Sequence, residues 1–400
     1  AAAALRARAL VVPPPRAAAA ASSAAPGLVV PEAPPGRDAV APASAVDGGA
    51  RSGLRHLAPI CWKLSKGKLT VWVALSALPG YLLAVPGAVD PLTAAALASG
   101  TFLTSASAQT LNQLREVDRD ARMRRTAQRP LPTGQISRED AARFAVASGS
   151  LGLAVLAAGA TPATAAVAAT TIATYVCVYT PMKVVSPYNT HIGAISGALP
   201  TLLGFTAALG ADALASPWAL GAWWLFGMQV LWQMPHFYAL AWIYKADYLR
   251  GGYKMFPLTD ATGAATAAMS KPYLAALSVL PWGLSAAGLA SWMLPIGSLA
   301  PSALWWHTFR AFEARPTQAT CRRFFLGSLT YLLAMLGLFT AFARPQKALA
   351  DGEEGPENQA GPLWRSRLYA LGVEACPHEQ ADVRMEMIGT GPSRCPLSRA

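Results

Sequence analysis

The chain alternates long apolar blocks with short basic segments, and this alternation restricts the folds that it can adopt. Lys and Arg are absent from five stretches, namely 69–114, 144–182, 184–244, 272–309 and 324–343. Apolar residues within them form blocks of about 20, the length that a helix needs to cross a bilayer. Because every backbone polar group in lipid must be hydrogen-bonded internally, these blocks predict spanning helices. The expected fold class is therefore an all-α integral membrane protein.

The composition agrees with this expectation. Hydrophobic residues make up 53% of the 400 residues and charged residues only 14%, against about 25% charged in a typical soluble protein. The formal net charge is +12, but the basic residues lie between apolar blocks. We therefore expect a lipid bilayer and an anionic substrate as partners, and no nucleic acid. The five Cys residues have no CxxC spacing and predict no disulfide framework.

The apolar blocks predict a bundle of about nine membrane-spanning helices. The expected spans are about 69–88, 92–111, 141–159, 163–181, 191–209, 218–240, 273–292, 295–309 and 325–343. With nine spans, every basic cluster lies on one side of the membrane, and the opposite loops near 86–91, 160–162, 210–217 and 293–296 contain no Lys or Arg. The positive-inside rule then places the N-terminus and the basic loops on the cytoplasmic or matrix side.

Both ends of the chain differ from this apolar region. Residues 1–55 are rich in Ala, Pro and Ser, and contain Arg6, Arg8 and Arg16 with no acid before Glu32. This pattern predicts an organellar transit peptide, with an ordinary disordered tail as the alternative. Residues 60–343 are the expected membrane domain and 344–400 an expected disordered tail. The transit peptide predicts a multi-pass protein of the mitochondrial inner membrane, with the N-terminus toward the matrix and a plastid as the alternative.

A dense group of charges follows the second apolar block, in the sequence NQLREVDRDARMRRTAQRPL at 112–131. Asn112, Glu116 and Asp120 are spaced at four-residue steps, so on a helix they share one face. Oxygen-bearing side chains in this arrangement are suited to Mg²⁺, and the neighbouring Arg residues to its anion. The alternative is a solvated helix with salt bridges at the membrane surface.

A second charged group, IYKADYLRGGYKMFP at 243–257, follows the sixth expected span. Asp247 is flanked there by Lys245 and Arg250, and Gly251-Gly252 lets the backbone turn. By itself this group could be a charged turn. Together the two groups predict acids that face one polyanion, for which a diphosphate held by Mg²⁺ and Arg side chains is the natural choice. Neutralising a leaving diphosphate favours cleavage of an allylic C–O bond.

The motif WQMPHF at 232–237 places His236 near the end of the sixth expected span. A single His in a helix usually has a structural role. Here the expected topology puts it at the same end as both acidic groups, which favours a ligand role. Pro235 is expected to kink the helix and open space beside it.

Several ordered motifs resemble the UbiA-type intramembrane prenyltransferases, and most closely their haem-farnesylating branch. They cover roughly 60–343. The first combines Asn112, Glu116 and Asp120 with Met123, Arg125-Thr126 and Arg129-Pro130-Leu131. The others are LSKGKLT (64–70), YTPMK (179–183), WQMPHF (232–237) and DYLRGGYKM (247–255).

The resemblance implies a bundle around a central cavity open to lipid, and a Mg²⁺-dependent enzyme. The implied reaction transfers farnesyl from farnesyl diphosphate to a vinyl group of haem B, with addition of water, to give haem O for haem A and cytochrome oxidase. Downstream haem A synthesis machinery is an implied partner. The implied catalytic residues are Asn112, Glu116, Asp120 and Asp247, with Glu116, Asp120 and Asp247 as metal ligands. The implied substrate-binding residues are Arg125, Arg129, Lys183, Lys245, Arg250, His236, Lys66 and Lys68.

The sequence departs from the family pattern at three positions. Glu116 stands where many relatives have Asp, Gly251 stands in place of a second acid after Asp247, and Val184 replaces the usual Arg. Two other functions stay open. One is a prenyltransferase of the same fold that acts on another aromatic acceptor or a quinone precursor. The other is a membrane transporter with intramembrane charges.

Overall fold

The computed structural model describes residues 50–85, 88–215 and 219–343. Within these ranges the chain is helical, apart from turns and an isolated bridge between Ala290 and Ala343. The predicted all-α fold class is confirmed. The predicted transit peptide lies outside the described residues as far as residue 49, and the predicted tail at 344–400 lies outside them entirely.

The helices follow one another with short connections. Their bounds are α1 Ala50–Leu64, α2 Gly67–Ala84, α3 Pro91–Arg122, α4 Arg138–Gly159, α5 Pro162–Ala173, the π-helix η1 Thr174–Tyr179, α6 Thr180–Val185, α7 Asn189–Leu209, α8 Asp212–Ala215, α9 Leu220–Ile243, α10 Lys245–Arg250, the 3₁₀ helix η3 Phe256–Leu258, α11 Ala264–Ala286, α12 Met293–Ala314 and α13 Gln318–Phe342.

Each expected span overlaps one of the long helices or the continuous run from α5 to α6. Five of these segments are long and apolar enough, by length and composition, to cross a membrane: Gly67–Ala84, Arg138–Gly159, Pro162–Val185, Asn189–Leu209 and Gln318–Phe342. The count of nine spans, and the central cavity, therefore stay predictions. The largest difference in bounds is at α3, which continues beyond residue 111 to Arg122.

Local sequence signals explain where several helices begin. The side chain of Asp90 accepts hydrogen bonds from the backbone N–H groups of Leu92 and Thr93, and Pro91 occupies the first helical position of α3. Ser137 caps α4 in the same way. These side chains satisfy N–H groups that have no partner inside the helix. Pro is tolerated at the first position because its missing N–H would have no intrahelical partner there.

Small residues allow α2 and α7 to pack closely. A Cβ atom added to Gly204 of α7 would lie 2.1 Å from the carbonyl oxygen of Ala77 and 2.3 Å from the amide nitrogen of Tyr81, both in the backbone of α2. Gly80 faces the same contact, since a Cβ there would lie 2.5 Å from the carbonyl oxygen of Thr201. Helices in membranes rely on such close backbone approach, because lipid provides no hydrophobic drive for association.

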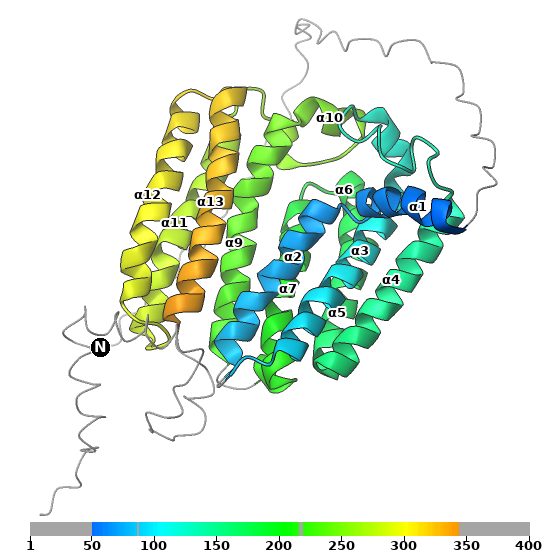
Figure 1. The fold of residues 1–400 in the computed structure, drawn as a ribbon. Helices are drawn as coiled ribbons and strands as arrows, with labels where there is room; N and C mark the ends of the chain where they lie inside the picture. Colours follow the sequence, from blue (N-terminus) through cyan, green and yellow to red (C-terminus); the bar gives the residue numbers. More distant parts are fainter. Residues whose placement is uncertain (1–49, 86–87, 216–218, 344–400) are drawn as a thin grey trace, which may run out of the picture. The chain divides into compact units, whose positions relative to one another are not determined.

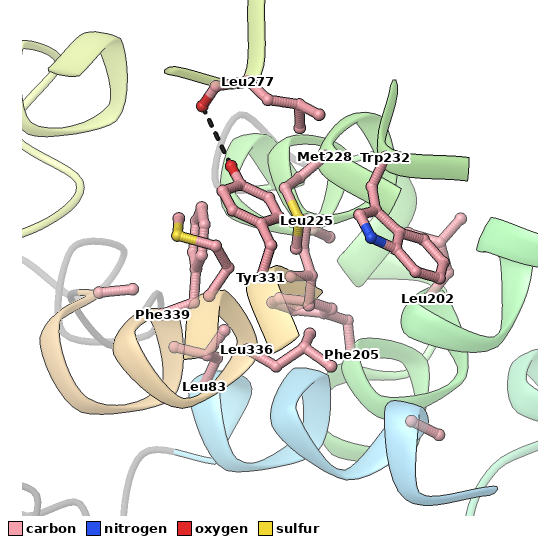
Figure 2. Close-up of a cluster of buried hydrophobic side chains, with 14 of the residues drawn as sticks. Leu83, Leu202, Phe205, Leu225, Met228, Trp232, Leu277, Tyr331, Leu336 and Phe339 are labelled. Atoms are coloured by element: carbon pink, nitrogen blue, oxygen red, sulfur yellow. Dashed lines mark hydrogen bonds between the residues drawn. The ribbon is translucent and has the colours of Figure 1, made fainter. Parts of the chain in front are cut away.

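A buried apolar cluster joins α2, α7, α9 and α13 (Figure 2). Phe205, Leu225 and Met228 are fully buried in it. The hydroxyl group of Tyr331 donates a hydrogen bond of 3.2 Å to the carbonyl oxygen of Leu277, which links α13 to α11. The cluster contains mainly aliphatic and aromatic side chains, and the acid–base groups lie elsewhere.

Figure 1 shows α1, α6 and α10 gathered at the same end of the helices, with α1 lying across that end. The C-terminal part of α3 reaches the same region, because α3 contacts both α1 and α10. Segments from four separate parts of the sequence therefore meet at one end, where both predicted charged groups lie.

We expect Gly204→Ala to destabilise the protein by about 1–3 kcal/mol, because the new methyl group would overlap the backbone of α2. Thermal unfolding of the purified protein in detergent measures the effect. The matched control is Gly227→Ala in α9, where an added Cβ meets no atom within 4 Å. That change should be neutral or stabilise by up to about 1 kcal/mol. Equal losses in the two variants would contradict the close contact.

Candidate functional site

Asn112, Glu116 and Asp120 lie on one buried face of α3. Their exposed fractions are 0%, 4% and 1%. The neighbouring Asp118 is turned away, and its side chain is 81% exposed. The helical spacing read from the sequence therefore separates the acids correctly: those in the stripe face the protein interior, and the acid between them faces outward. A fully solvated helix does not describe this stripe.

Each polar side chain of the stripe contacts a cation from another segment. Glu116 Oε1 lies 2.9 Å from Lys183 Nζ, which comes from α6. Asp120 Oδ2 lies 2.6 Å from Arg129 Nη1, which comes from the loop after α3. Asn112 Oδ1 accepts a hydrogen bond of 3.3 Å from Lys66 Nζ, at the start of α2. Three predicted substrate-binding cations thus converge on the three predicted catalytic residues.

One carboxylate oxygen in this cluster has no partner. Asp120 Oδ1 is buried and makes no hydrogen bond. A buried acceptor of this kind is costly unless a ligand, an ion or water completes it. Among the described residues, no group of three or more His, Cys, Asp and Glu side chains is arranged to hold a metal ion. A cation bound here would therefore need oxygen ligands from a substrate as well as from the protein.

Lys183 follows the fourth expected span, which contains an irregular helical segment. The π-helix η1 interrupts the run just before α6, and such irregularities are frequent at functional sites. Thr180 Oγ1 accepts a hydrogen bond of 3.0 Å from Asn112 Nδ2, which ties α6 to α3. The Lys183 ammonium lies 4.6 Å from the ring centroid of Tyr179 and 5.9 Å from that of Tyr253. These contacts hold a largely buried ammonium group beside Glu116.

Lys66 lies between α1 and α2, outside the spanning helices, in a left-handed backbone conformation with φ of 48°. Burial lowers the pKa of Lys66 to about 7, and the positive charges of Arg129 and Lys183 lower it further. An anion bound between these three cations would raise the pKa again, because it would favour the charged ammonium form. The cluster is thus electrostatically suited to bind an anion.

Asp247 connects the two charged groups predicted from the sequence. Its Oδ1 accepts a hydrogen bond of 3.1 Å from the backbone N–H of Arg124, and it also pairs with Arg250. Arg125 lies against the rings of Tyr244 and Tyr248 and donates to the Tyr248 hydroxyl group at 3.2 Å. The loop after α3 is therefore joined to α10 by the very residues predicted to face a polyanion.

The other predicted residues occupy different surroundings. Lys245 Nζ donates a hydrogen bond of 2.9 Å to the carbonyl oxygen of Asp260, on the loop before α11. Lys68 is exposed. His236 Nδ1 lies 2.7 Å from Ser328 Oγ, and its ring stacks between those of Trp232 and Phe325. His236 is thus oriented by α13. Within the described part of the chain, no hydrogen bond, ion pair or ring contact joins it to the acid–base cluster.

The surroundings of Gly251 leave little space for a side chain. A Cβ there would lie 3.1 Å from Met123 Sδ and 3.1 Å from the ring of Tyr253. A larger residue at this position would require these neighbours to shift by a few tenths of an ångström. Gly252 has a φ of 72°, which reverses the chain after α10.

Two further residues shape the site without being predicted. The carboxylate of Asp260 accepts hydrogen bonds from the backbone N–H groups of Gly263 (2.8 Å) and Thr266 (2.7 Å) at the start of α11. Asn189 is fully buried next to the loop after α10. The pattern of an Asp just before a helix could have indicated the first of these. No sequence signal indicated the second, because its side chain donates to backbone carbonyl groups, one of them 65 positions away on Lys254.

Solved structures share this fold. A structure related to digeranylgeranylglyceryl phosphate synthase aligns with a TM-score of 0.58 at 15% identity, over 72% of this chain and 98% of that chain. The apo structure of a UbiA homolog from Aeropyrum pernix aligns with a TM-score of 0.54 at 20% identity, over 71% of this chain and 98% of that chain. At these identities the likeness concerns the fold alone.

Several curated proteins share a higher sequence identity with this chain than these solved structures do. The chain is 36% identical to "Protoheme IX farnesyltransferase, mitochondrial" of Arabidopsis thaliana over 69% of this chain and 63% of that protein. It is 37% identical to the human protein of the same name over 74% of this chain and 64% of that protein. The chain thus spans somewhat under two thirds of these two relatives. It is 38% identical to "Protoheme IX farnesyltransferase" of Salinibacter ruber over 69% of this chain and 95% of that protein.

The family model of the UbiA prenyltransferases matches residues 73–340, which include the α3 stripe, Lys183 and α10. This match covers more than half of the chain, and it agrees with the helical fold and with the sequence relatives. The chain belongs to the UbiA prenyltransferase family.

Proposed function

We propose that this protein transfers the farnesyl group of farnesyl diphosphate to a vinyl group of haem B and so forms haem O. The relatives named protoheme IX farnesyltransferase support the choice of substrates. The observation that carries the proposal is the buried cluster in which Glu116 and Asp120 meet Lys183 and Arg129. Such a cluster, at the end of an apolar helix bundle, suits a substrate that combines a negatively charged group with a hydrophobic chain.

The cations of the cluster would bind the diphosphate. Lys183, Arg129 and Lys66 approach from three different segments, so they can contact oxygens on several sides of a diphosphate. They would stabilise the negative charge that develops on the leaving group as the allylic C–O bond breaks. Bonding of the farnesyl C1 to the vinyl carbon, followed by addition of water, gives the hydroxyethylfarnesyl side chain. Exclusion of bulk water by the helices would protect the reactive farnesyl carbon until then.

Mg²⁺ fits the acids of this cluster. Asp120 Oδ1 is buried without a partner, and Glu116 lies one helical turn away on the same face, so two carboxylates are in position. Asn112 would orient the substrate from the preceding turn, and Asp247 would act from α10 through phosphate or water. When bound, the ion would supply Lewis-acid stabilisation of the diphosphate. Lys183 and Arg129 would then pair with phosphate oxygens.

The porphyrin would contact residues on the α9 side of the site. Because Ser328 engages His236 Nδ1, the ring is fixed and would present Nε2 to a ligand. Arg125, Arg250, Lys245 and Lys68 are the remaining proposed contacts for the propionate and diphosphate groups. Arg125 and Arg250 would have to leave their present partners on α10 to make them, and Lys245 would have to leave the carbonyl oxygen of Asp260.

The relatives from plant and human mitochondria support a mitochondrial membrane location. We propose the inner membrane, with the basic end that carries α1, α6 and α10 toward the matrix. This orientation follows from the positive-inside rule applied to the basic segments. Downstream haem A synthesis machinery is the proposed partner that receives the product.

The direct test combines purified protein with farnesyl diphosphate, haem B and Mg²⁺, and identifies the product by mass spectrometry. We expect farnesylated haem, and we expect its formation to stop when EDTA removes the metal and to resume when excess Mg²⁺ is added. Farnesyl transfer to a quinone precursor but not to haem would identify a different acceptor. Product formation that is unaffected by EDTA would contradict the role of the metal.

Replacement of Glu116 by Gln should lower kcat/KM by about 100-fold or more, because it removes a carboxylate from the charge-stabilising cluster. Asp118→Asn is the matched control, since this acid lies two residues away but is exposed and pairs with the exposed Arg138. It should retain nearly full activity. Thermal unfolding of both variants separates loss of chemistry from loss of folding. Equal activities of the two variants would contradict the assignment of the buried face.

A further inference from the structure

Lys254 hydrogen-bonds the loop after α10 to the end of α6. The backbone N–H of Lys254 donates a hydrogen bond of 2.7 Å to the carbonyl oxygen of Lys183. The carbonyl oxygen of Lys254 accepts a hydrogen bond of 2.5 Å from Asn189 Nδ2. Both backbone polar groups of Lys254 are therefore held, one by the helix that carries Lys183 and the other by the side chain that begins α7.

This arrangement provides hydrogen-bond partners for backbone carbonyl groups at the end of α6. The last carbonyl groups of a helix have no partner within the helix, and α6 ends at Val185, two residues after Lys183. Lys254 satisfies the carbonyl group of Lys183, and the Asn189 amide also donates 2.6 Å to the carbonyl group of Ser186. Asn189 thus bridges the end of α6 and the loop after α10, and its side chain is fully buried while doing so.

Two groups of the site lie next to this contact. Tyr253 directly precedes Lys254, is buried, and has its ring centroid 5.9 Å from the Lys183 ammonium and 5.7 Å from the centroid of Tyr248. Lys183 lies at the other end of the same contact and pairs with Glu116. Release of Lys254 would free Tyr253 to move away from Lys183, and would leave the carbonyl group of Lys183 without its partner.

We propose that Asn189 is a positioning residue for diphosphate binding. It holds the loop after α10 against α6 and so sets the relative positions of Lys183 and Tyr253, although its side-chain amide donates to backbone carbonyl groups and to neither of these side chains. This inference rests on the proposed function in one respect, namely that Lys183 binds the diphosphate. It predicts that Asn189 affects the affinity for diphosphate specifically, whereas a residue that only stabilises the bundle would not.

The test compares Asn189→Asp with the unmodified full-length protein in detergent or nanodiscs. Asp has nearly the same shape as Asn, but it loses both donors and turns a carboxylate toward two carbonyl oxygens. Binding of inorganic diphosphate is measured by calorimetry in the presence of Mg²⁺, and stability by thermal unfolding. We expect the Kd for diphosphate to rise at least tenfold. Asn189→Ser, which keeps one short donor, is a milder variant that should fold and should show a smaller rise.

Tyr331→Phe is the matched control. It also removes a buried side-chain donor to a backbone carbonyl group between helices, but within the apolar cluster of Figure 2. We expect it to lower the unfolding temperature and to leave the Kd for diphosphate unchanged. A second readout compares the effects on the two substrates. In the Asn189 variants the KM for farnesyl diphosphate should rise. The affinity for haem B, measured by optical absorption, should stay the same.

Any of three results would overturn the inference. Both Asn189 variants could bind diphosphate as tightly as the unmodified protein does, or Tyr331→Phe could lose as much diphosphate binding as they do. The third is that the Asn189 variants lose haem binding and diphosphate binding equally. Failure of the proposed function looks different. In that case the unmodified protein binds diphosphate and forms no farnesylated haem, and a weaker binding of diphosphate by the Asn189 variants still supports the positioning role.

Discussion

The structure depends on the burial of two ion pairs at one end of an apolar helix bundle. Removing Glu116, Asp120, Lys183 and Arg129 from water costs several kcal/mol per ion, and pairing offsets this only when geometry and additional hydrogen bonds are favourable. Apolar residues of similar size often stabilise a fold as well or better. Stability alone therefore does not account for these pairs. We propose that their value lies in chemistry, because charges held in an apolar site act strongly on a bound anion.

The rest of the fold keeps these charges in place. Close contact between α2 and α7 at Gly80 and Gly204 fixes the helices that flank the site. The π-helix before α6 and the Asn112–Thr180 hydrogen bond set the position of Lys183. On the other side, the Asp247 contact to the Arg124 backbone and the Asn189 contact to Lys254 hold the two loops. The charged groups are thus supported by close backbone packing and by short side chains that hydrogen-bond to each other or to the backbone.

The fold class and the α3 stripe could be predicted from the sequence because both depend on local periodicity. Apolar blocks long enough to span a membrane as helices indicate the all-α membrane fold class. The four-residue spacing puts Asn112, Glu116 and Asp120 on one face of a helix. Pairings between distant segments could not be predicted. Lys183 pairs with Glu116, which lies 67 positions away in the sequence, and Lys245 donates to the backbone carbonyl group of Asp260. Lys245 and Asn189 both donate to backbone carbonyl groups. Because every residue type has a backbone carbonyl group, the sequence does not indicate which one will be the partner.

The central claim is that the buried cluster at the end of α3 is where the diphosphate binds. It is tested most directly by a cryo-EM structure of the protein in nanodiscs with Mg²⁺ and a non-reactive farnesyl diphosphate analogue. The account predicts diphosphate density between Lys183 and Arg129, with a metal ion against Glu116 and the now unpartnered oxygen of Asp120. Diphosphate density at another place, with both ion pairs intact, would contradict it.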